Sequence, residues 1–163
     1  MSERTLTMMR EYRSKRRELA VLLVQLQNFT GLSETEVIES MQFSQPQEER
    51  VQTSNISDKT AQIATSFRER TRRLNEEWYE YLFEQYYDLK EELDFFDFAL
   101  SQLSGQLPGI MHDLVVDQAS WEQVMERYHI SRKTLWRYRQ KAIEELDHLY
   151  EMRDKQIASF ILN

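Results

Sequence analysis

The residues of this sequence whose types and spacing could do chemistry gather between positions 131 and 141. This stretch carries five basic residues and no acidic residue, in a chain whose formal net charge is -7. Arginine and lysine can bond guanine edges, glutamine can bond adenine, and the other polar side chains can hold phosphates. The pattern predicts a surface for duplex DNA, made by Ser131, Arg132, Lys133, Trp136, Arg137, Arg139, Gln140 and Lys141.

Two helices joined by a short turn are expected to position these side chains. Ser120 and Gln123 match a capping box that opens the first helix, and Ser131 caps the second. His129 falls where the turn needs a left-handed residue, a conformation that histidine tolerates better than most. Two helices joined by three or four residues form a helix-turn-helix, whose second helix enters the major groove. The apolar residues expected to form one buried stripe on each helix are Trp121, Val124, Met125 and Tyr128, then Leu135, Tyr138, Ala142 and Leu146.

Residues 120–146 (SWEQVMERYHISRKTLWRYRQKAIEEL) resemble the helix-turn-helix of region four of bacterial sigma factors. The matching residues are Trp121-Glu122, Val124, Ile130-Ser131, Thr134-Leu135, Ala142 and Leu146, and residues 107–119 (LPGIMHDLVVDQA) resemble the first helix of that family. The sequence departs from the family at His129, where glycine is usual, and at Met125, where a small residue is usual. No segment resembles sigma region two.

The start of the long charged helix, Ser57-Asp58-Lys59-Thr60-Ala61, is similar to phage and prophage regulators of the ArpU-like and RinA-like late-gene activator group. Proteins of that group join such a helix to a sigma-like C-terminal domain. Taken together, the resemblances cover residues 57–150 and imply duplex DNA binding near a promoter, with RNA polymerase as a further partner. They do not imply a complete sigma factor.

Few helix-breaking residues interrupt the chain. With 163 residues, only 3 Gly and 2 Pro, and 30% charged residues, the composition favours long helices over sandwiches or barrels. We therefore expect an all-α protein. The predicted segments are an N-terminal helical segment (residues 1–43), a polar linker (44–56), a long acidic helix (57–104) and a helix-turn-helix DNA-binding domain (105–163).

Capping and stop signals locate the other helices. A helix with a basic first half is expected over residues 2–29, and Gly31 is a suitable stop. Ser33 and Glu36 then match a capping box that opens a short helix. Pro108 suits the first turn of a helix that we expect to end near residue 117.

The long helix carries an apolar seam and an acidic outer face. The seam could mediate dimerisation, or it could pack within the chain against the N-terminal helix or the C-terminal domain. The outer face could be solvated, could repel DNA, or could dock a basic partner such as polymerase or the helix that carries Arg13–Arg17. The seam residues are Leu82, Tyr86, Leu89, Leu93, Phe96, Leu100 and Leu103. The acidic residues are Glu76, Glu77, Glu80, Glu84, Asp88, Glu91, Glu92, Asp94 and Asp97, with Lys90 the one base among them.

Trp136 lies on the expected DNA face, where an indole could contact a sugar or a thymine methyl group. It could equally pack against the N-terminal region. The sequence alone leaves both interpretations open.

Several classes of chemistry are not expected. The chain has no Cys, and its histidines (His112, His129 and His148) are far apart in sequence, so we expect no metal site and no cofactor. No phosphate-binding glycine loop or nucleophile motif is present, and we expect no catalytic residue and no enzyme. The longest apolar run has six residues, far short of a membrane span. These features predict a protein of the bacterial host cytoplasm.

The leading hypothesis is a sequence-specific DNA-binding regulator of transcription, with a homo-oligomer as a further possibility. One alternative is the small subunit of a phage DNA-packaging terminase, which also couples a helix-turn-helix to an oligomerising helix. A ring-shaped oligomer would favour it. Another alternative is a helical adaptor that binds protein only, whose basic helix is merely solvated.

Overall fold

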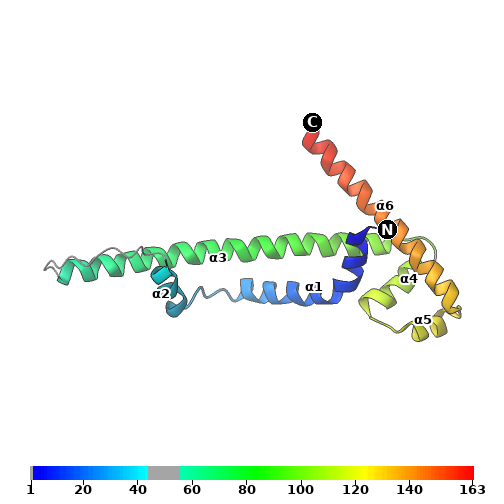
Figure 1. Ribbon diagram of the computed structural model, residues 1–163, viewed down its shortest axis with the longest axis horizontal. Helices are drawn as coiled ribbons and strands as arrows, with labels where there is room; N and C mark the ends of the chain where they lie inside the picture. The colour runs from blue at the N-terminus through cyan, green and yellow to red at the C-terminus, as the bar shows by residue number, and fades with distance from the viewer. Residues whose placement is uncertain (1, 44–55) are drawn as a thin grey trace. The chain divides into compact units, whose positions relative to one another are not determined.

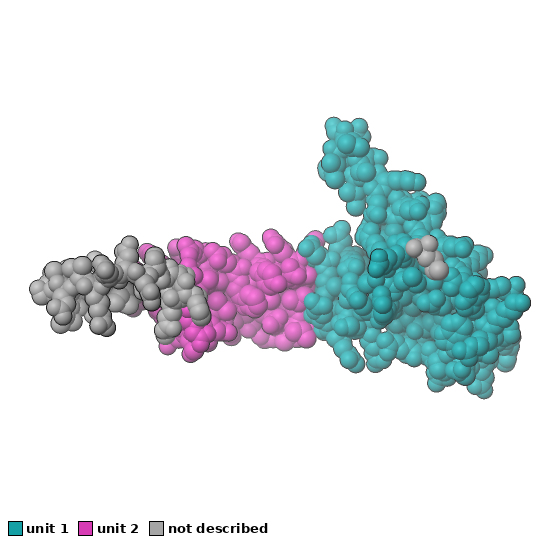
Figure 2. Space-filling model, viewed as in Figure 1, with its two compact units in different colours: residues 1–20, 88–163 teal, residues 21–87 magenta. Residues whose placement is uncertain are grey.

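The chain is mainly helical in the part that the computed structural model describes, residues 2–43 and 56–163. The described residues form six α-helices and no strand (Figure 1), which confirms the all-α prediction. The chain divides into two compact units, coloured in Figure 2. One contains residues 1–20 and 88–163, and the other contains residues 21–87. The units differ from the predicted segments because helices α1 (Glu3–Gln27) and α3 (Ile56–Ser101) each contribute to both.

In the unit of residues 21–87, the turn after α1 is fixed by Gly31. Its φ is +84°, and a Cβ added there would lie 2.8 Å from the Asn75 side chain. Asn75 Oδ1 accepts a hydrogen bond from the Leu32 amide at 2.8 Å. The Phe29 and Tyr79 rings meet edge to face with centroids 5.2 Å apart. A glycine is therefore needed here both for its backbone conformation and for the close approach to α3.

The capping box predicted at Ser33 opens α2 (Glu34–Phe43). Ser33 Oγ accepts from the Glu36 amide at 3.3 Å, and Glu36 Oε2 accepts from the Ser33 amide at 2.8 Å. The hydrogen bonds from the backbone and hydroxyl of Ser33 lower the pKa of Glu36. The predicted polar linker, apart from residue 56, lies outside the described residues.

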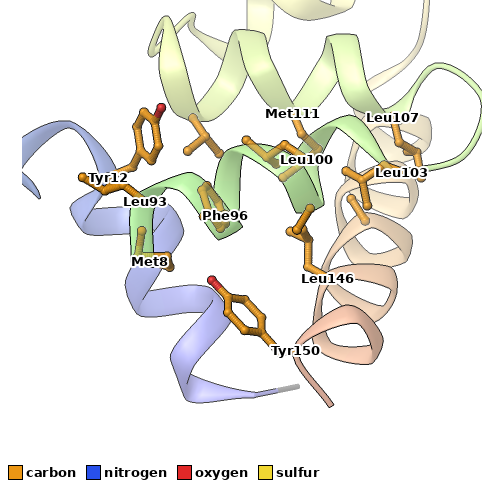
Figure 3. Close-up of a cluster of buried hydrophobic side chains, with 13 residues drawn as sticks. Met8, Tyr12, Leu93, Phe96, Leu100, Leu103, Leu107, Met111, Leu146 and Tyr150 are labelled. Carbon is orange, nitrogen blue, oxygen red and sulfur yellow. The ribbon is translucent and has the colours of Figure 1, made fainter. Parts of the chain in front are cut away.

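The unit of residues 1–20 and 88–163 is built around the C-terminal part of the seam (Figure 3). Side chains of α1, α3, α4 (Leu107–Met111), the π-helical turn η1 (His112–Val116) and α6 (Arg132–Leu162) pack together there. In this unit the seam is thus covered from within the chain, by the N-terminal helix and by the C-terminal helices together. The buried members of this core are Met8, Tyr12, Leu93, Phe96, Ala99, Leu100, Leu103, Leu107, Met111, Val115, Ala142, Leu146 and Tyr150.

Ion pairs and hydrogen bonds fasten the basic part of α1 to the acidic side of α3. Lys15 Nζ lies 2.9 Å from Glu92 Oε1, and Arg16 pairs with Asp97. The Tyr12 hydroxyl donates to Asp97 at 2.6 Å. Within this unit, part of the acidic face thus docks the basic helix of the same chain, which is one of the interpretations that the sequence left open.

The helix expected from Pro108 to residue 117 is divided in the structure. The α-helical part, α4, ends at Met111, and the following turn is π-helical, with the Asp117 amide donating to the His112 carbonyl at 3.1 Å. Gln118 then takes a left-handed φ of 52°. The predicted extent of the helix is therefore confirmed, and only its second part differs, being π-helical; the buried Asp113 side chain lies in this wider turn and meets α5.

Candidate nucleic-acid interface

Local hydrogen bonds define two helices and the connection between them. At the start of α5 (Trp121–Tyr128), the Gln123 amide donates to Ser120 Oγ at 3.1 Å and the Ser120 amide donates to Gln123 Oε1 at 2.9 Å. His129 ends α5 with φ 52° and ψ 46°. Ser131 caps α6 by accepting from the Thr134 amide at 3.2 Å. Each of these local features was predicted from the sequence and is confirmed.

A small apolar cluster packs α5 against α4 and the start of α6. Ile110, Val124 and Leu135 are its fully buried members. The other residues predicted for the two stripes are half-buried around them, apart from Ala142 and Leu146, which are buried in the larger core. The packing leaves one side of the first turns of α6 to solvent. The partly buried residues packed against the cluster are Leu114, Ala119, Trp121, Met125, Tyr128, Ile130 and Tyr138.

An ion pair joins α5 to the π-helical turn η1. Arg127 Nη1 lies 2.7 Å from Asp113 Oδ2, and the Asp113 side chain is 9% exposed. Burial, the charge of Asp113 and a hydrogen bond to it raise the pKa of Tyr128. The Tyr128 hydroxyl also fills the space in which a Cβ at Gly109 would lie, 2.7 Å away. The side chains of α5 are thereby held in one position relative to the turn.

Four of the predicted DNA-contacting residues share one face of α6. Lys133, Trp136, Arg137 and Gln140 recur at steps of three, one and three, which places them opposite buried Leu135. Lys133 and Arg137 are exposed, Trp136 is 54% exposed, and Gln140 is half-buried. Among the described residues, the two basic side chains have no ion pair. The exposure of Trp136 argues against packing on the N-terminal region within the described chain.

Three other predicted residues are placed differently. Arg132 Nη1 lies 3.5 Å from Glu122 Oε1, and its guanidinium stands 5.4 Å from the centre of the Trp121 ring. Lys141 Nζ lies 3.9 Å from Glu145 Oε1. Arg139 is half-buried and follows Leu135 by four residues, so it lies toward the packed side of α6.

The start of α6 presents backbone amides at the exposed end of the helix. Ser131 is exposed, and α6 is 31 residues long, so the amides of its first turn carry the positive end of a long helix dipole. Lys133 lies in the same turn. Backbone amides and a basic side chain are therefore available together to one phosphate group.

The structure also brings together three residues that sequence reasoning did not associate. Oxygen and nitrogen atoms of His112, Asp113 and Asp117 lie within 4.8 Å of one another. His112 Nδ1 is 3.4 Å from Asp117 Oδ2, while Asp113 is already paired with Arg127. The sequence-based prediction considered only how far His112 lies from the other two histidines. It therefore missed this cluster, in which the partners of His112 are two carboxylates close to it in the chain. The position of His112 one residue before an aspartate was the available signal.

Comparisons with protein-family models, curated proteins and solved structures give no significant match to this chain. Among the described residues, no helix is long and apolar enough to cross a membrane.

Proposed function

We propose that this chain is a sequence-specific regulator of transcription that binds double-stranded DNA, similar to the ArpU-like and RinA-like phage and prophage activators. In this proposal, α6 lies in the major groove, α5 supports it, and the first turn of α6 faces a phosphate. RNA polymerase is a further proposed partner, and the bacterial cytoplasm is the proposed location. We assign the chain no catalytic role.

One observation carries the proposal. The face of α6 that contains Lys133, Trp136, Arg137 and Gln140 is open to solvent, while its opposite face is buried against α4 and α5. The residues 131–141 carry a charge of +5 in a chain of net charge -7, because this segment has five bases and no acid. A basic helix face with guanine- and adenine-bonding side chains suits direct reading of base edges.

Arg132 fits a supporting role in the same proposal. Its contact with Glu122 is an exposed ion pair, with side chains 71% and 73% exposed. Such pairs contribute about 0–1 kcal/mol, so a phosphate could replace the carboxylate at little cost. Arg139 lies on the packed side of α6, so in this proposal it contacts at most the DNA phosphate backbone. Lys141 lies at the edge of the proposed DNA-binding face.

The decisive experiment selects bound fragments from the source genome and then titrates salt. Phosphate neutralisation makes the logarithm of the binding constant fall linearly with the logarithm of salt concentration. We expect both an enriched sequence and a steep salt dependence. Binding without enrichment and without salt dependence would refute the proposal and favour the protein-only adaptor.

Variants then test the face itself. Arg137→Ala should cost about 1–3 kcal/mol of binding free energy and relax specificity at one base pair. Lys141→Ala should weaken all sequences alike and reduce the salt slope by about one. Lys155→Ala is the matched control, because Lys155 is an exposed base on α6 well beyond the proposed face. Wild-type binding by Arg137→Ala, or an equal loss in Lys155→Ala, would contradict the assignment.

A further inference from the structure

Three arginines form an exposed row on α1, in the unit of residues 1–20 and 88–163. Arg10, Arg13 and Arg17 follow one another at steps of three and four residues, and all three are exposed. At about 100° per residue, these positions share one side of the helix. The other side carries Met8 and Tyr12, which are 1% and 5% exposed and lie in the core. The arginine row therefore faces away from the packing that holds α1.

The two other bases in this part of α1 already have acidic partners. Lys15 and Arg16 pair with Glu92 and Asp97 of α3, and these contacts hold the two helices together. Among the described residues, by contrast, the three arginines of the row have no ion pair. The charge that α1 can offer to a partner outside the chain is therefore concentrated in the arginine row.

The acidic residues of α1 lie to the side of the row or at its end. Glu11 and Glu18 each follow an arginine of the row directly, which places them about 100° around the helix. Glu3 lies seven residues before Arg10 and bounds the row toward the N-terminus. Residues 10–17 contain five bases and one acid, a charge of +4. The row is thus the positive side of a predominantly positive segment.

A hydrogen bond joins the row to the connection that precedes α5. Arg13 Nη1 donates to Gln118 Oε1 at 3.0 Å. Gln118 has a left-handed φ of 52°, and the next amide, that of Ala119, donates to the Asp113 carbonyl at 2.8 Å. Ser120, which caps α5, is two residues beyond Gln118. The arginine row therefore lies beside the start of the helix that supports α6.

We propose that the arginine row binds phosphate groups of the same DNA duplex that α6 contacts, outside the base pairs that α6 reads. This inference rests on the proposed DNA binding and adds a second contact to it. A guanidinium group can donate two parallel hydrogen bonds to a phosphate. Phosphate contacts carry no base preference, so the row supplies affinity and position, while the face of α6 supplies specificity.

The length and the place of the row both favour DNA as its partner. From Arg10 to Arg17 the helix rises about 10 Å. Phosphates of one strand follow one another at about 3.4 Å along the duplex axis, so a helix that follows the strand spans about three of them. An acidic protein surface is the alternative partner. The position of the row beside α5, in the same compact unit as the segment of charge +5, favours DNA over it.

Salt titration of the full chain on a duplex that carries the selected sequence tests the row. The triple variant Arg10→Gln, Arg13→Gln and Arg17→Gln should reduce the slope of log binding constant against log salt by about 2.7, at about 0.9 per phosphate. The affinity advantage of the wild type over this variant should then shrink about 40-fold between about 50 mM and about 200 mM salt. The triple lysine variant is the matched control, because it keeps the three charges and should retain most of the slope. Circular dichroism of both variants shows whether the helices are retained.

Methylphosphonate substitution of the same duplex locates the phosphates, because each such linkage removes one negative charge. The phosphates that the row holds should be those whose substitution weakens the wild type but not the triple glutamine variant. Both proteins should keep the same base preference, which Arg137→Ala should instead relax. As single variants, Arg17→Gln should lower the salt slope by about 0.9, and Lys155→Gln, which changes an exposed base of α6 beyond the proposed face, should leave it unchanged.

Three results would overturn the proposal. The first is a triple glutamine variant with the wild-type affinity and salt slope, which would leave the row to an acidic protein surface. The second is the same methylphosphonate profile in both proteins, and the third is an equal loss of slope in Lys155→Gln. Failure of the proposed function looks different. A wild type that selects no sequence would refute the regulator, while a salt slope that still depends on the arginines would support their role in holding phosphates.

Discussion

Asp113→Ala is expected to lower the free energy of unfolding by about 2–3 kcal/mol, more than any exposed ion pair of the chain would. Asp113 is the buried partner in the contact that holds α5 against the π-helical turn, with its side chain 9% exposed and Arg127 Nη1 2.7 Å away. The charge of the same carboxylate also contributes to the raised pKa of Tyr128. Its removal therefore affects two residues of α5 together.

The magnitude follows from the exposure of the partners. Loss of a hydrogen bond to a charged group costs about 1.5–3 kcal/mol. The Arg127 side chain is 59% exposed, so water replaces the lost carboxylate there and the cost stays toward the lower end. Tyr128 is half-buried, so the loss of the polar partner beside it adds about 1 kcal/mol.

Urea unfolding followed by circular dichroism measures the effect, and a double-mutant cycle isolates the pair. We expect Asp113→Ala and Arg127→Ala to show a coupling energy of at least about 1 kcal/mol. The matched control is the cycle of Glu122→Ala and Arg132→Ala, whose side chains are 73% and 71% exposed at 3.5 Å. Its coupling should stay below about 0.5 kcal/mol. Equal coupling in the two cycles would show that the burial of Asp113 does not determine the strength of the contact.

Three further predictions concern the same unit. His129→Gly should stabilise the fold by about 0.5–1 kcal/mol, because the left-handed φ of 52° strains any residue with a Cβ. For the same reason, His129→Val should destabilise the fold by more than about 1 kcal/mol. Thermal unfolding of both variants checks the sign of each change. Leu146→Ala should cost about 2–5 kcal/mol in chemical denaturation because Leu146 is fully buried, and a cost below about 1 kcal/mol would contradict the core assignment. Burial, opposed by the Arg4 charge, raises the pKa of Tyr150 to about 12 from an ordinary value of 10.0. The folded state therefore favours the neutral phenol, so stability from this group is complete below pH 10 and is lost as the pH rises toward 12. The Tyr150 hydroxyl has no hydrogen-bond partner among the described residues, so Tyr150→Phe should leave the free energy of unfolding unchanged or raise it below pH 10. The variant should also lose less stability between pH 10 and pH 12 than the wild type does. An equally steep loss of stability in the variant would refute this assignment.

Local signals in the sequence were sufficient for the helix ends around the candidate interface. The Ser120 and Ser131 caps and the left-handed His129 depend on residues within three or four positions of one another, and a sequence shows such neighbours directly. The one-sided distribution of Lys133 and Arg137 on α6 is likewise a property of helical spacing. The DNA-binding function inferred from these features stays a prediction.

Contacts between residues far apart in the chain could not be predicted in the same way. Gly109 lies inside α4 with the Tyr128 hydroxyl in the space where a Cβ would be, and nothing in the sequence shows this contact. The seam was compatible with dimerisation and with internal packing, and only the three-dimensional arrangement set Leu100 against Leu146 and its neighbours in one core. Arg139 was included in the expected basic surface, but the burial of Leu135, four residues before it, shows that this side of α6 is the packed one.

The sequence by itself determined the all-α class, the capped turn between α5 and α6, and the concentration of positive charge on residues 131–141. These properties follow from propensity, capping and periodicity, which act over a few residues. Only the tertiary structure decided which of the eight predicted residues share an open face, and which carboxylates the basic helix α1 neutralises. Those outcomes depend on how distant helices pack, because burial of apolar surface fixes the rotation of each helix and hence the direction of every charged side chain on it.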